Sequence, residues 1–188
     1  LSMAIDRALL TEVGYGKAGT PTCNLVPAPA LYASDNTACL TQDIAGANAM
    51  LEDAGWVKGS DGVRAKDGVR ISILYQTSTN AVRQDFQALI KGWWAEIGIE
   101  VELRNISGSV FFGGDAGSPD TFQKFYADVE MYANTFNGTD PQSYLGNGLC
   151  DKAPTPDSQW QGENISRFCM PEYDALHAKL ATTAGADA

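Results

Sequence analysis

The four cysteines are the residues whose type and spacing most clearly predict a chemical role. Cys23 lies 16 positions before Cys39, and Cys150 lies 19 positions before Cys169. None of them forms a Cys-x-x-Cys pair or a cluster with the spacing of a zinc site. The pattern favours two local disulfides in an oxidising compartment, each worth about 3 kcal/mol of stability. Four separate buried thiols and pairing between the two couples are the alternatives left open.

Other groups that could carry chemistry lack the context that a reaction needs. Gly14, Gly16 and Gly19 match G-x-G-x-x-G, but the run follows a helical pattern and leads into Pro-Thr-Cys, whereas a dinucleotide site needs strand, turn and helix. His177 is the only histidine and lies beside acidic and basic neighbours on a helical pattern, as a solvated surface histidine does. No serine lies in a G-x-S-x-G elbow. The sequence therefore predicts no enzyme, no catalytic residue, no metal and no cofactor.

Composition limits the partners that these residues could serve. The 188 residues carry a net charge of -10, so most of the surface would repel the phosphate backbone of nucleic acid or an anionic membrane. Hydrophobic residues make up 44% of the chain, and no apolar run is long enough to cross a bilayer. We expect a single globular domain over residues 1–188 with a sizeable core.

Two segments of regular pattern lie in the first half of the chain. The opening residues 1–10 predict an amphipathic helix already under way, and residues 41–55 predict a second helix with Thr41 as N-cap and Gly55 as its stop. Two Asp-Gly turns follow, at residues 61–62 and 67–68. They enclose one short arm of a hairpin. The other arm leads into an alternating strand with Val69, Ile71, Ile73 and Tyr75 on one face.

The clearest pattern predicts a strand, helix and strand crossover. Apolar residues recur at helical spacing along one stripe, which comprises Phe86, Leu89, Ile90, Trp93, Trp94 and Ile97. Gly98 ends that helix, and residues 99–103 alternate as a second strand, so the two strands should be parallel. The tryptophans are interpreted as core packing. Residues 107–114 favour a short helix, and residues 128–133 favour a third strand. Pro171 starts a closing helix with Tyr173, Leu176 and Leu180 inward.

Both ends of the chain interrupt a pattern. The first residue is not Met, no basic and apolar leader precedes the first helix, and the final residues stop beside a helix without a cap. We therefore expect a fragment of a longer protein.

The motifs, taken in order, resemble the extracytoplasmic solute-binding proteins of ABC importers, family 5. The resemblance rests on AIDRALL, the LEDAGW helix end with its DGVRAKDG hairpin, the helix and strand block from Arg83 to Leu103, DPQSYL, and EYDAL. It implies an α/β, periplasmic-binding-protein-like fold (type II, cluster C). The chain would be part of the C-terminal lobe, with a mixed sheet flanked by helices and the hairpin acting as scaffold.

The same resemblance implies partners and a location. A small-molecule or peptide ligand would bind between this lobe and a missing N-terminal lobe, and ABC permease subunits would recognise the closed form. The protein would be periplasmic or extracytoplasmic, and nucleic acid would not be a partner. A lone lobe would bind its ligand very weakly.

The wall of the ligand site would be the strand and loop before the Asp-Pro motif. By the resemblance, its candidate ligand-binding residues are Tyr132, Asn134, Thr135, Phe136, Asn137 and Asp140. Peptide binders of the family commonly place an Asp four residues before the proline and a Trp seven before it, where this chain has Asn137 and Asn134. An amide has no charge to pair with a peptide's terminal ammonium. The hypothesis is a polar neutral, modified or opine-like solute; the alternative is that both amides cap a turn.

Two other classes of function remain open to the residues. A flavodoxin-like α/β enzyme or cofactor-binding domain would use the carboxyl ends of the crossover strands, and its candidate phosphate loop would be TSTN at residues 77–80. The other class is an interaction domain without a small-molecule ligand.

Overall fold

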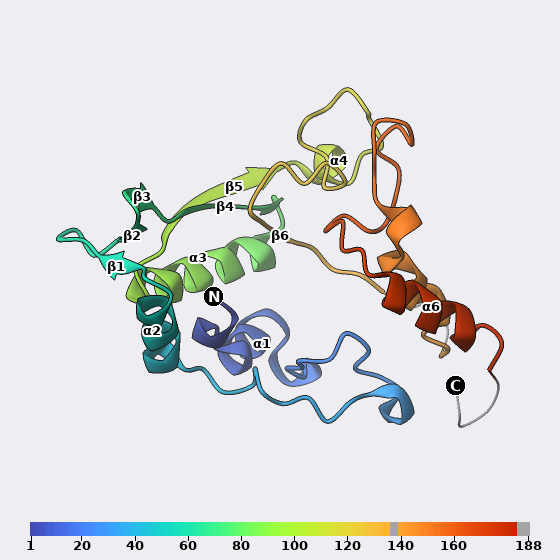
Figure 1. Cartoon of the computed structure of the whole chain (residues 1–188), viewed down its shortest axis with the longest axis horizontal. Helices are drawn as coiled ribbons and strands as arrows, with labels where there is room; N and C mark the ends of the chain where they lie inside the picture. Colours follow the sequence, from blue (N-terminus) through green and yellow to red (C-terminus); the bar gives the residue numbers. More distant parts are fainter. Residues whose placement is uncertain (136–138, 184–188) are drawn as a thin grey trace. The chain divides into compact units, whose positions relative to one another are not determined.

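The computed structural model describes residues 1–135 and 139–183, which form two compact units (Figure 1). The first unit comprises Leu1–Ile106 and Ala127–Tyr132, and the second comprises Ser107–Tyr126 and Ala133–Ala188. The expectation of one domain over the whole chain stays a prediction. The α/β class is confirmed, because the first unit combines helices with the parallel sheet and the hairpin described below.

A parallel sheet forms the centre of the first unit. Its strands are β4 (Ser72–Ser78), β5 (Glu100–Ile106) and β6 (Val129–Met131), in the order β5-β4-β6. β4 pairs with both neighbours in parallel, with Tyr75 opposite Leu103 and Val129. The predicted crossover and third strand are thereby confirmed. The connecting helix α3 (Ala81–Glu96) begins at Asn80, whose side chain accepts a hydrogen bond from Arg83 N.

Helix α3 packs the predicted apolar stripe against this sheet. Ile90, Trp94 and Ile97 are buried, and Trp93 packs against them at the edge. The Tyr75 and Trp94 rings lie 5.7 Å apart between centroids. The prediction that the tryptophans serve the core is confirmed. The buried cluster comprises Ala4, Ala47, Ile73, Tyr75, Ile90, Trp94, Ile97, Ile99 and Val101.

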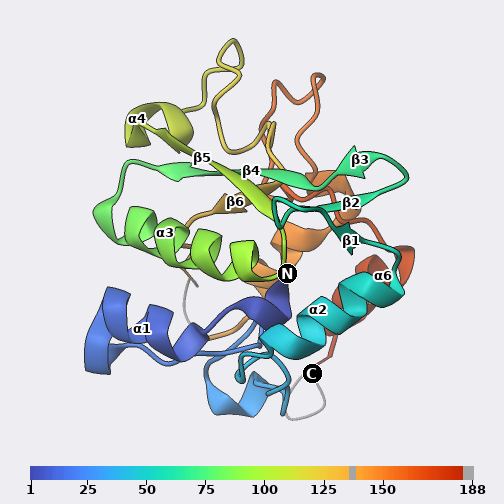
Figure 2. The ribbon, with the colours of Figure 1, turned by 90° about the vertical axis from the view of Figure 1, so that its left-hand side faces the viewer.

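The N-terminal segment differs from the continuous helix that its pattern predicts. A 3-10 turn, η1 (Ser2–Ala4), is followed by extended backbone at Ile5 and then by α1 (Arg7–Tyr15). The break arises because the side chain of Asp6 accepts a hydrogen bond from Leu9 N at 2.9 Å and so caps a new helix. Helix α1 lies against α3 on the side away from the sheet (Figure 2). A β-carbon at Gly14 would collide with the Phe86 ring, so the close approach needs glycine there.

The second helix begins later than predicted. Helix α2 (Ile44–Asp53) has Asp43 as its N-cap, not Thr41, because the Asp43 carboxylate accepts from Gly46 N at 2.7 Å. A carboxylate in this position also suits the positive end of the helix dipole. The stop at Gly55 is confirmed, with φ at +85°.

The hairpin is a separate antiparallel sheet of three short strands. β1 (Val57–Lys58), β2 (Arg64–Lys66) and β3 (Val69–Arg70) lie in that order. The sequence predicted one continuous strand that begins at Val69. The structure differs, because the strand is interrupted at Ile71 and its two parts, β3 and β4, belong to different sheets. As a result Val69 is 64% exposed, and the buried face begins at Ile73.

Arg64 ties this hairpin to the rest of the first unit. Its side chain is fully buried, and Nε donates to Ile97 O at 2.9 Å. Nη1 donates to Trp56 O, and Nη2 donates to the side chains of Asn48 (2.8 Å) and Glu52 (2.9 Å). One guanidinium thus joins the end of α2, the hairpin and the end of α3, which gives the Asp-Gly hairpin a scaffolding role.

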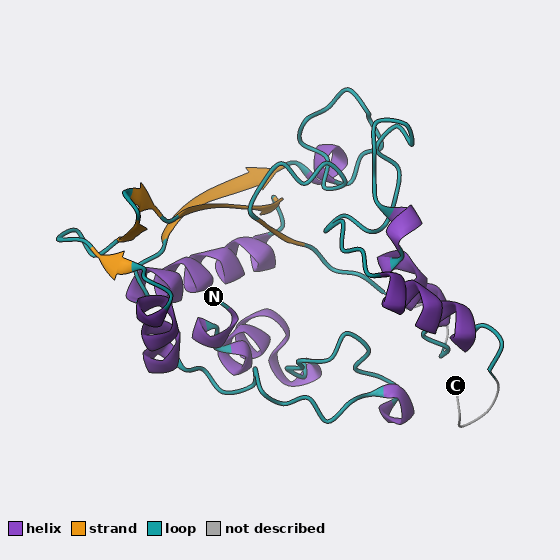
Figure 3. Cartoon of the chain, in the orientation of Figure 1, coloured by secondary structure: helices purple, strands orange, loops and turns teal. Residues whose placement is uncertain are grey.

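The second unit consists largely of loops and short helices (Figure 3). Phe111 is buried in an aromatic group with Phe112 and Phe122. The buried amide of Asn164 donates to three backbone carbonyls, those of Gly148, Leu149 and Phe168. Its helices are α4 (Gly108–Phe111), α5 (Gln142–Leu145), η4 (Gly146–Gly148), η5 (Cys150–Lys152) and α6 (Pro171–Leu180), and the first unit adds the short turns η2 (Gly16–Ala18) and η3 (Ala30–Tyr32).

Helix α6 begins at Pro171 as predicted, but the prediction that Leu176 points inward is wrong. Leu176 is 66% exposed. The inward positions are instead fixed by polar contacts: Tyr173 donates from its hydroxyl to Leu145 O at 2.6 Å, and His177 Nε2 lies 3.0 Å from Gln142 O. A carbonyl only accepts, so this contact places the His177 proton on Nε2. The histidine is half-buried and holds a carbonyl, which differs from the solvated surface residue predicted.

Both local disulfides are present. Cys23 is bonded to Cys39 in the first unit, and Cys150 is bonded to Cys169 in the second. The structure therefore contradicts the two alternatives, which were disulfides between the two couples and four separate thiols.

Candidate functional site

The predicted ligand-binding segment begins where β6 ends. Tyr132 follows the strand and is half-buried, while Asn134, Thr135 and Asp140 are exposed. Phe136 and Asn137 lie outside the described residues. The structure therefore leaves the assignment of this segment to the ligand as a prediction.

Two of the exposed side chains in this segment already shape its backbone. Asn134 Oδ1 accepts from Thr135 N at 2.9 Å. Asp140 Oδ1 accepts from the N–H of Gln142, the first residue of α5, at 2.9 Å. These contacts resemble the turn-capping role held open as the alternative for Asn134. They use only the carbonyl oxygen of Asn134. The amide NH₂ of Asn134 takes no part in them.

Polar side chains gather at the carboxyl end of the parallel sheet beside β6. Gln76, Thr77 and Ser78 end β4 and are all buried. Thr77 Oγ1 donates to Met131 O at 2.6 Å, and Ser78 Oγ accepts from Arg83 Nη1 at 2.7 Å. In open α/β sheets this end of the strands is where ligands bind. Here the polar atoms fix the path of β6 and the start of α3.

A second polar layer supports the same end of the sheet from α3. Gln87 is fully buried; it donates to Tyr75 O at 2.9 Å and accepts from Asn105 Nδ2 at 2.6 Å. Sequence reasoning missed Gln76, Thr77, Ser78 and Gln87 as positioning residues. The available signal was a polar run directly after an apolar alternation, with one glutamine inside an apolar helical stripe.

The same geometry bears on the flavodoxin-like alternative. Its candidate phosphate loop would be residues 77–80. Thr77 and Ser78 are the last residues of β4, and Asn80 is the N-cap of α3, so only Thr79 lies between the strand and the helix cap. The hydroxyls of Thr77 and Ser78 are engaged in the bonds described above. That alternative is not favoured.

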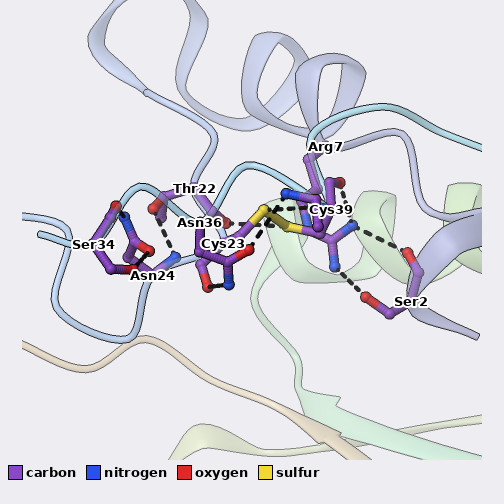
Figure 4. Close-up of a disulfide and its surroundings, with 9 residues drawn as sticks. Ser2, Arg7, Thr22, Cys23, Asn24, Ser34, Asn36 and Cys39 are labelled. Atoms are coloured by element: carbon purple, nitrogen blue, oxygen red, sulfur yellow. Dashed lines mark hydrogen bonds between the residues drawn. A yellow bond between two sulfur atoms is a disulfide. The ribbon is translucent and has the colours of Figure 1, made fainter.

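A cleft of about 600 Å³ lies beside the disulfide of the first unit (Figure 4). Arg7 forms one end of it: Nη1 donates to Cys39 O at 3.0 Å and to Ser2 O at 3.1 Å, and Nη2 donates to Ser2 Oγ at 2.9 Å. Burial lowers the pKa of Arg7. The cleft is lined by Ser2, Met3, Arg7, Thr22, Cys23, Asn24, Leu25, Asn36, Ala38 and Cys39.

The side chains of this cleft hold its own loop. Asn24 and Ser34 exchange hydrogen bonds of 2.7 Å and 2.6 Å across the loop, and Cys39 N donates to Cys23 Sγ (Figure 4). Sequence reasoning predicted Cys23 and Cys39 as a disulfide but missed the cleft. A loop rich in Pro and Asn shows no period that would have placed its side chains.

Two classes of site are absent from the part of the chain that the structure describes. In residues 1–135 and 139–183 no three His, Cys, Asp or Glu side chains are placed to hold a metal ion. Over the same residues, none of the helices has the length and apolar content that crossing a bilayer requires.

Comparison with known proteins gives a consistent family match. The profile of the bacterial extracellular solute-binding proteins, family 5, middle region, matches residues 1–154. Protein XP55 of Streptomyces lividans is 32% identical over 111 residues, which are 58% of this chain and 20% of that protein.

Solved structures share the fold over almost the whole chain. The oligopeptide-binding protein AppA of Bacillus subtilis, in complex with a nonapeptide, superposes with a TM-score of 0.77 and 21% identity, covering 99% of this chain and 35% of AppA. A periplasmic oligopeptide-binding protein of Thermotoga maritima with mannohexaose bound gives a TM-score of 0.76 and 17% identity, covering 99% of this chain and 35% of that protein. The chain thus spans about a third of the length of these structures and a fifth of XP55.

Proposed function

This chain belongs to the bacterial extracellular solute-binding proteins of family 5, and we propose that it forms part of the C-terminal lobe of a two-lobed binding protein for an ABC importer. The observation that carries the proposal is the family match over residues 1–154. The parent protein would capture a solute outside the cytoplasm and present it to permease subunits in the membrane. In this role the chain binds and performs no reaction.

The proposed ligand contacts are Tyr132, Asn134, Thr135, Phe136, Asn137 and Asp140. Support comes from the exposure of Asn134, Thr135 and Asp140 in the segment that follows β6 in the sequence. Tyr132 and Phe136 would supply ring faces and the amides would supply hydrogen bonds, a combination that suits a solute with many hydroxyl groups.

The proposed solute is polar and lacks a free terminal ammonium, as an oligosaccharide or a modified peptide does. Asn137 offers no negative charge to pair with an ammonium. The Thermotoga maritima relative with mannohexaose bound supports a sugar within this fold. AppA in complex with a nonapeptide represents the other class of ligand.

The mechanism follows from the difference in contacts between open and closed states. A solute that touches both lobes binds the closed state more tightly, and its differential affinity sets how far the population moves toward closure. One lobe alone supplies half of those contacts. The isolated chain should therefore bind the solute much more weakly than the parent protein does.

Calorimetry on the parent protein tests the proposal. Panels of dipeptides to pentapeptides and of neutral oligosaccharides would be titrated into the wild type and into Asn137→Asp and Asn137→Ala. We expect oligosaccharide binding in the wild type, about tenfold or greater loss in Asn137→Ala, and a gain of free-amine peptide binding in Asn137→Asp. Asn36→Asp adds the same charge in the disulfide loop of the first unit and should change neither panel.

The opposite result would be tight binding of free peptides by the wild type that survives Asn137→Ala. That outcome would overturn the neutral-solute assignment while leaving the binding-protein role intact. Failure of every solute to close the parent protein, measured by small-angle scattering, would overturn the role itself.

A further inference from the structure

The second unit contains two cations on one indole ring. The Lys124 ammonium lies 5.3 Å from the centroid of the Trp160 ring, and the Arg167 guanidinium lies 5.9 Å from it. Tyr126 meets the same ring edge-on at 6.0 Å. We call these four residues the Trp160 cluster. They come from two segments, 124–126 and 160–167, that are far apart in the sequence.

The loop that carries Trp160 is held from several sides. Trp160 N donates to Thr155 O at 2.8 Å, and Ser158 Oγ donates to Gln161 O at 2.8 Å. Gly162 lies so close to Lys152 O that a β-carbon there would collide with it. The disulfide from Cys150 to Cys169 closes the whole segment. The position of the indole is therefore set by the fold and not by the cations.

Arg167 is bound to the other segment of the cluster through backbone carbonyls. Nη2 donates to Gln123 O at 3.1 Å and Lys124 O at 3.2 Å, and Nη1 donates to Ile165 O at 2.7 Å. These bonds fix the guanidinium beside Lys124. They neutralise none of its charge.

Several residues in and beside the cluster have positive φ, a backbone conformation that is unfavourable for residues other than glycine. Of the five non-glycine residues with positive φ in the described chain, four lie here: Phe125, Gln159, Trp160 and Arg167, with φ between 51° and 61°. Such conformations are strained for residues other than glycine, and they concentrate where a ligand is bound. Here the strain lies where two cations meet a tryptophan.

Among the described residues, the two cations of the cluster donate to backbone carbonyls. Lys124 is only 7% exposed, and its ammonium donates to Ala116 O at 2.7 Å. The ion pairs formed by residues 1–135 and 139–183 include neither Lys124 nor Arg167. A buried ammonium without a counter-charge is costly, and an anion would remove that cost.

We propose that the Trp160 cluster binds a small carboxylate anion between the Lys124 ammonium and the Arg167 guanidinium. An ammonium has three N–H donors and a guanidinium has five, so both keep donors beyond the bonds to carbonyls described above. Charge-assisted bonds from both groups match the two oxygens of a carboxylate. This inference is independent of the proposed solute and of the importer.

Titration with succinate tests the site. The indole N–H resonance of Trp160 would be followed by NMR, assigned by its loss in Trp160→Phe, with ionic strength held constant by sodium chloride. We expect a saturable shift of this resonance. Arg167→Gln should weaken binding about tenfold or more, and Arg167→Lys, which keeps the charge, should retain most of it. Lys152→Gln removes an exposed lysine that pairs with Asp151 and should bind succinate as the wild type does.

The proposal would be overturned if chloride alone reproduced the shift. It would equally be overturned if Arg167→Gln bound succinate as tightly as the wild type. Because Arg167 is exposed, its variant should keep the wild-type circular dichroism spectrum and so decide the matter even where a variant of buried Lys124 fails to fold. A wild-type spectrum that does not respond to succinate is the third result that would end the proposal.

Discussion

The two units of this chain achieve order by different means. The first buries a continuous apolar cluster between a parallel sheet and α3, and its strands satisfy their own backbone groups. The second has short helices and long loops. There, buried polar side chains such as Asn164 and Lys124 hold carbonyls, and a disulfide closes the longest loop. Regular backbone pairs with itself, whereas irregular backbone needs side chains or covalent links to satisfy it.

This difference predicts which substitutions each unit can tolerate without losing stability. In the first unit, most surface positions should be neutral, and loss of stability should follow from damage to the apolar cluster or to Arg64. In the second, single polar residues and the disulfide should matter more than any apolar contact. The tryptophans report on the two units separately, since Trp56, Trp93 and Trp94 belong to the first and Trp160 to the second.

The largest effect should come from Arg64→Met, which breaks the rule that polar side chains matter mainly in the second unit. Removing the guanidinium leaves the carbonyls of Trp56 and Ile97 and the Asn48 side chain without their donor. We expect a loss of about 3–5 kcal/mol in the free energy of unfolding. Urea unfolding followed by tryptophan fluorescence in a Trp160→Phe background measures it.

The matched control for this change is Lys66→Met, on the same strand. Lys66 is exposed and donates to Ala54 O at 2.8 Å. It should change the free energy of unfolding by about 0.5 kcal/mol or less. Equal losses in the two variants would show that Arg64 is not the tie that joins α2, the hairpin and α3.

A smaller effect should come from opening the disulfides, and it should sharpen the difference between the units. Cys150→Ser with Cys169→Ser should cost about 3 kcal/mol and should alter Trp160 fluorescence, because the loop that carries this ring loses its closure. Cys23→Ser with Cys39→Ser opens a loop outside the apolar cluster. In this second variant, the urea midpoint measured from the fluorescence of Trp93 and Trp94 should stay closer to the wild-type value. The reverse order of midpoints would contradict the account of the second unit.

The smallest effect should be an electrostatic one on the hairpin surface. The hydrogen bond from Arg70, followed by that from Val63 N, lowers the pKa of Asp61. A carboxyl with a lowered pKa stabilises the fold above its unfolded-state pKa, and that contribution is lost as the pH falls through the folded-state value. In Arg70→Ala the pKa of Asp61 should rise but stay below the ordinary value, because Val63 N still donates. NMR titration of the carboxyl carbon measures this change, and an unaltered pKa would show that Arg70 does not act on Asp61.

Sequence periodicity predicted the first unit well. The helix stripe from Phe86 to Ile97, the two flanking strands and the strand after residue 128 all depend on repeating apolar positions, and burial follows such repeats directly. Errors arose where one side chain decided a boundary. Asp6 and Asp43 each start a helix through a single hydrogen bond, and the break at Ile71 depends on which sheet each half of the strand joins.

The second unit was less predictable for the same reason. Its loops have no period, so nothing in the sequence brought Lys124 close to Trp160 or placed Asn164 inside. The disulfides were predictable because local spacing constrains cysteine pairing. Of the candidate site, the segment after β6 came from family resemblance, whereas the buried polar ends of β4 and α3 required the fold to be known.

The strand order β5-β4-β6 has a consequence for synthesis. A nascent polypeptide that has emerged only as far as Ile106 contains β4 and β5 but lacks β6, because the excursion through residues 107–126 must be made first. Until Met131 is available, one side of β4 offers open amides and carbonyls to any neighbouring chain, which is a known route to aggregation. A holding chaperone would therefore be needed most during the interval in which residues 107–131, 25 residues in all, leave the ribosome.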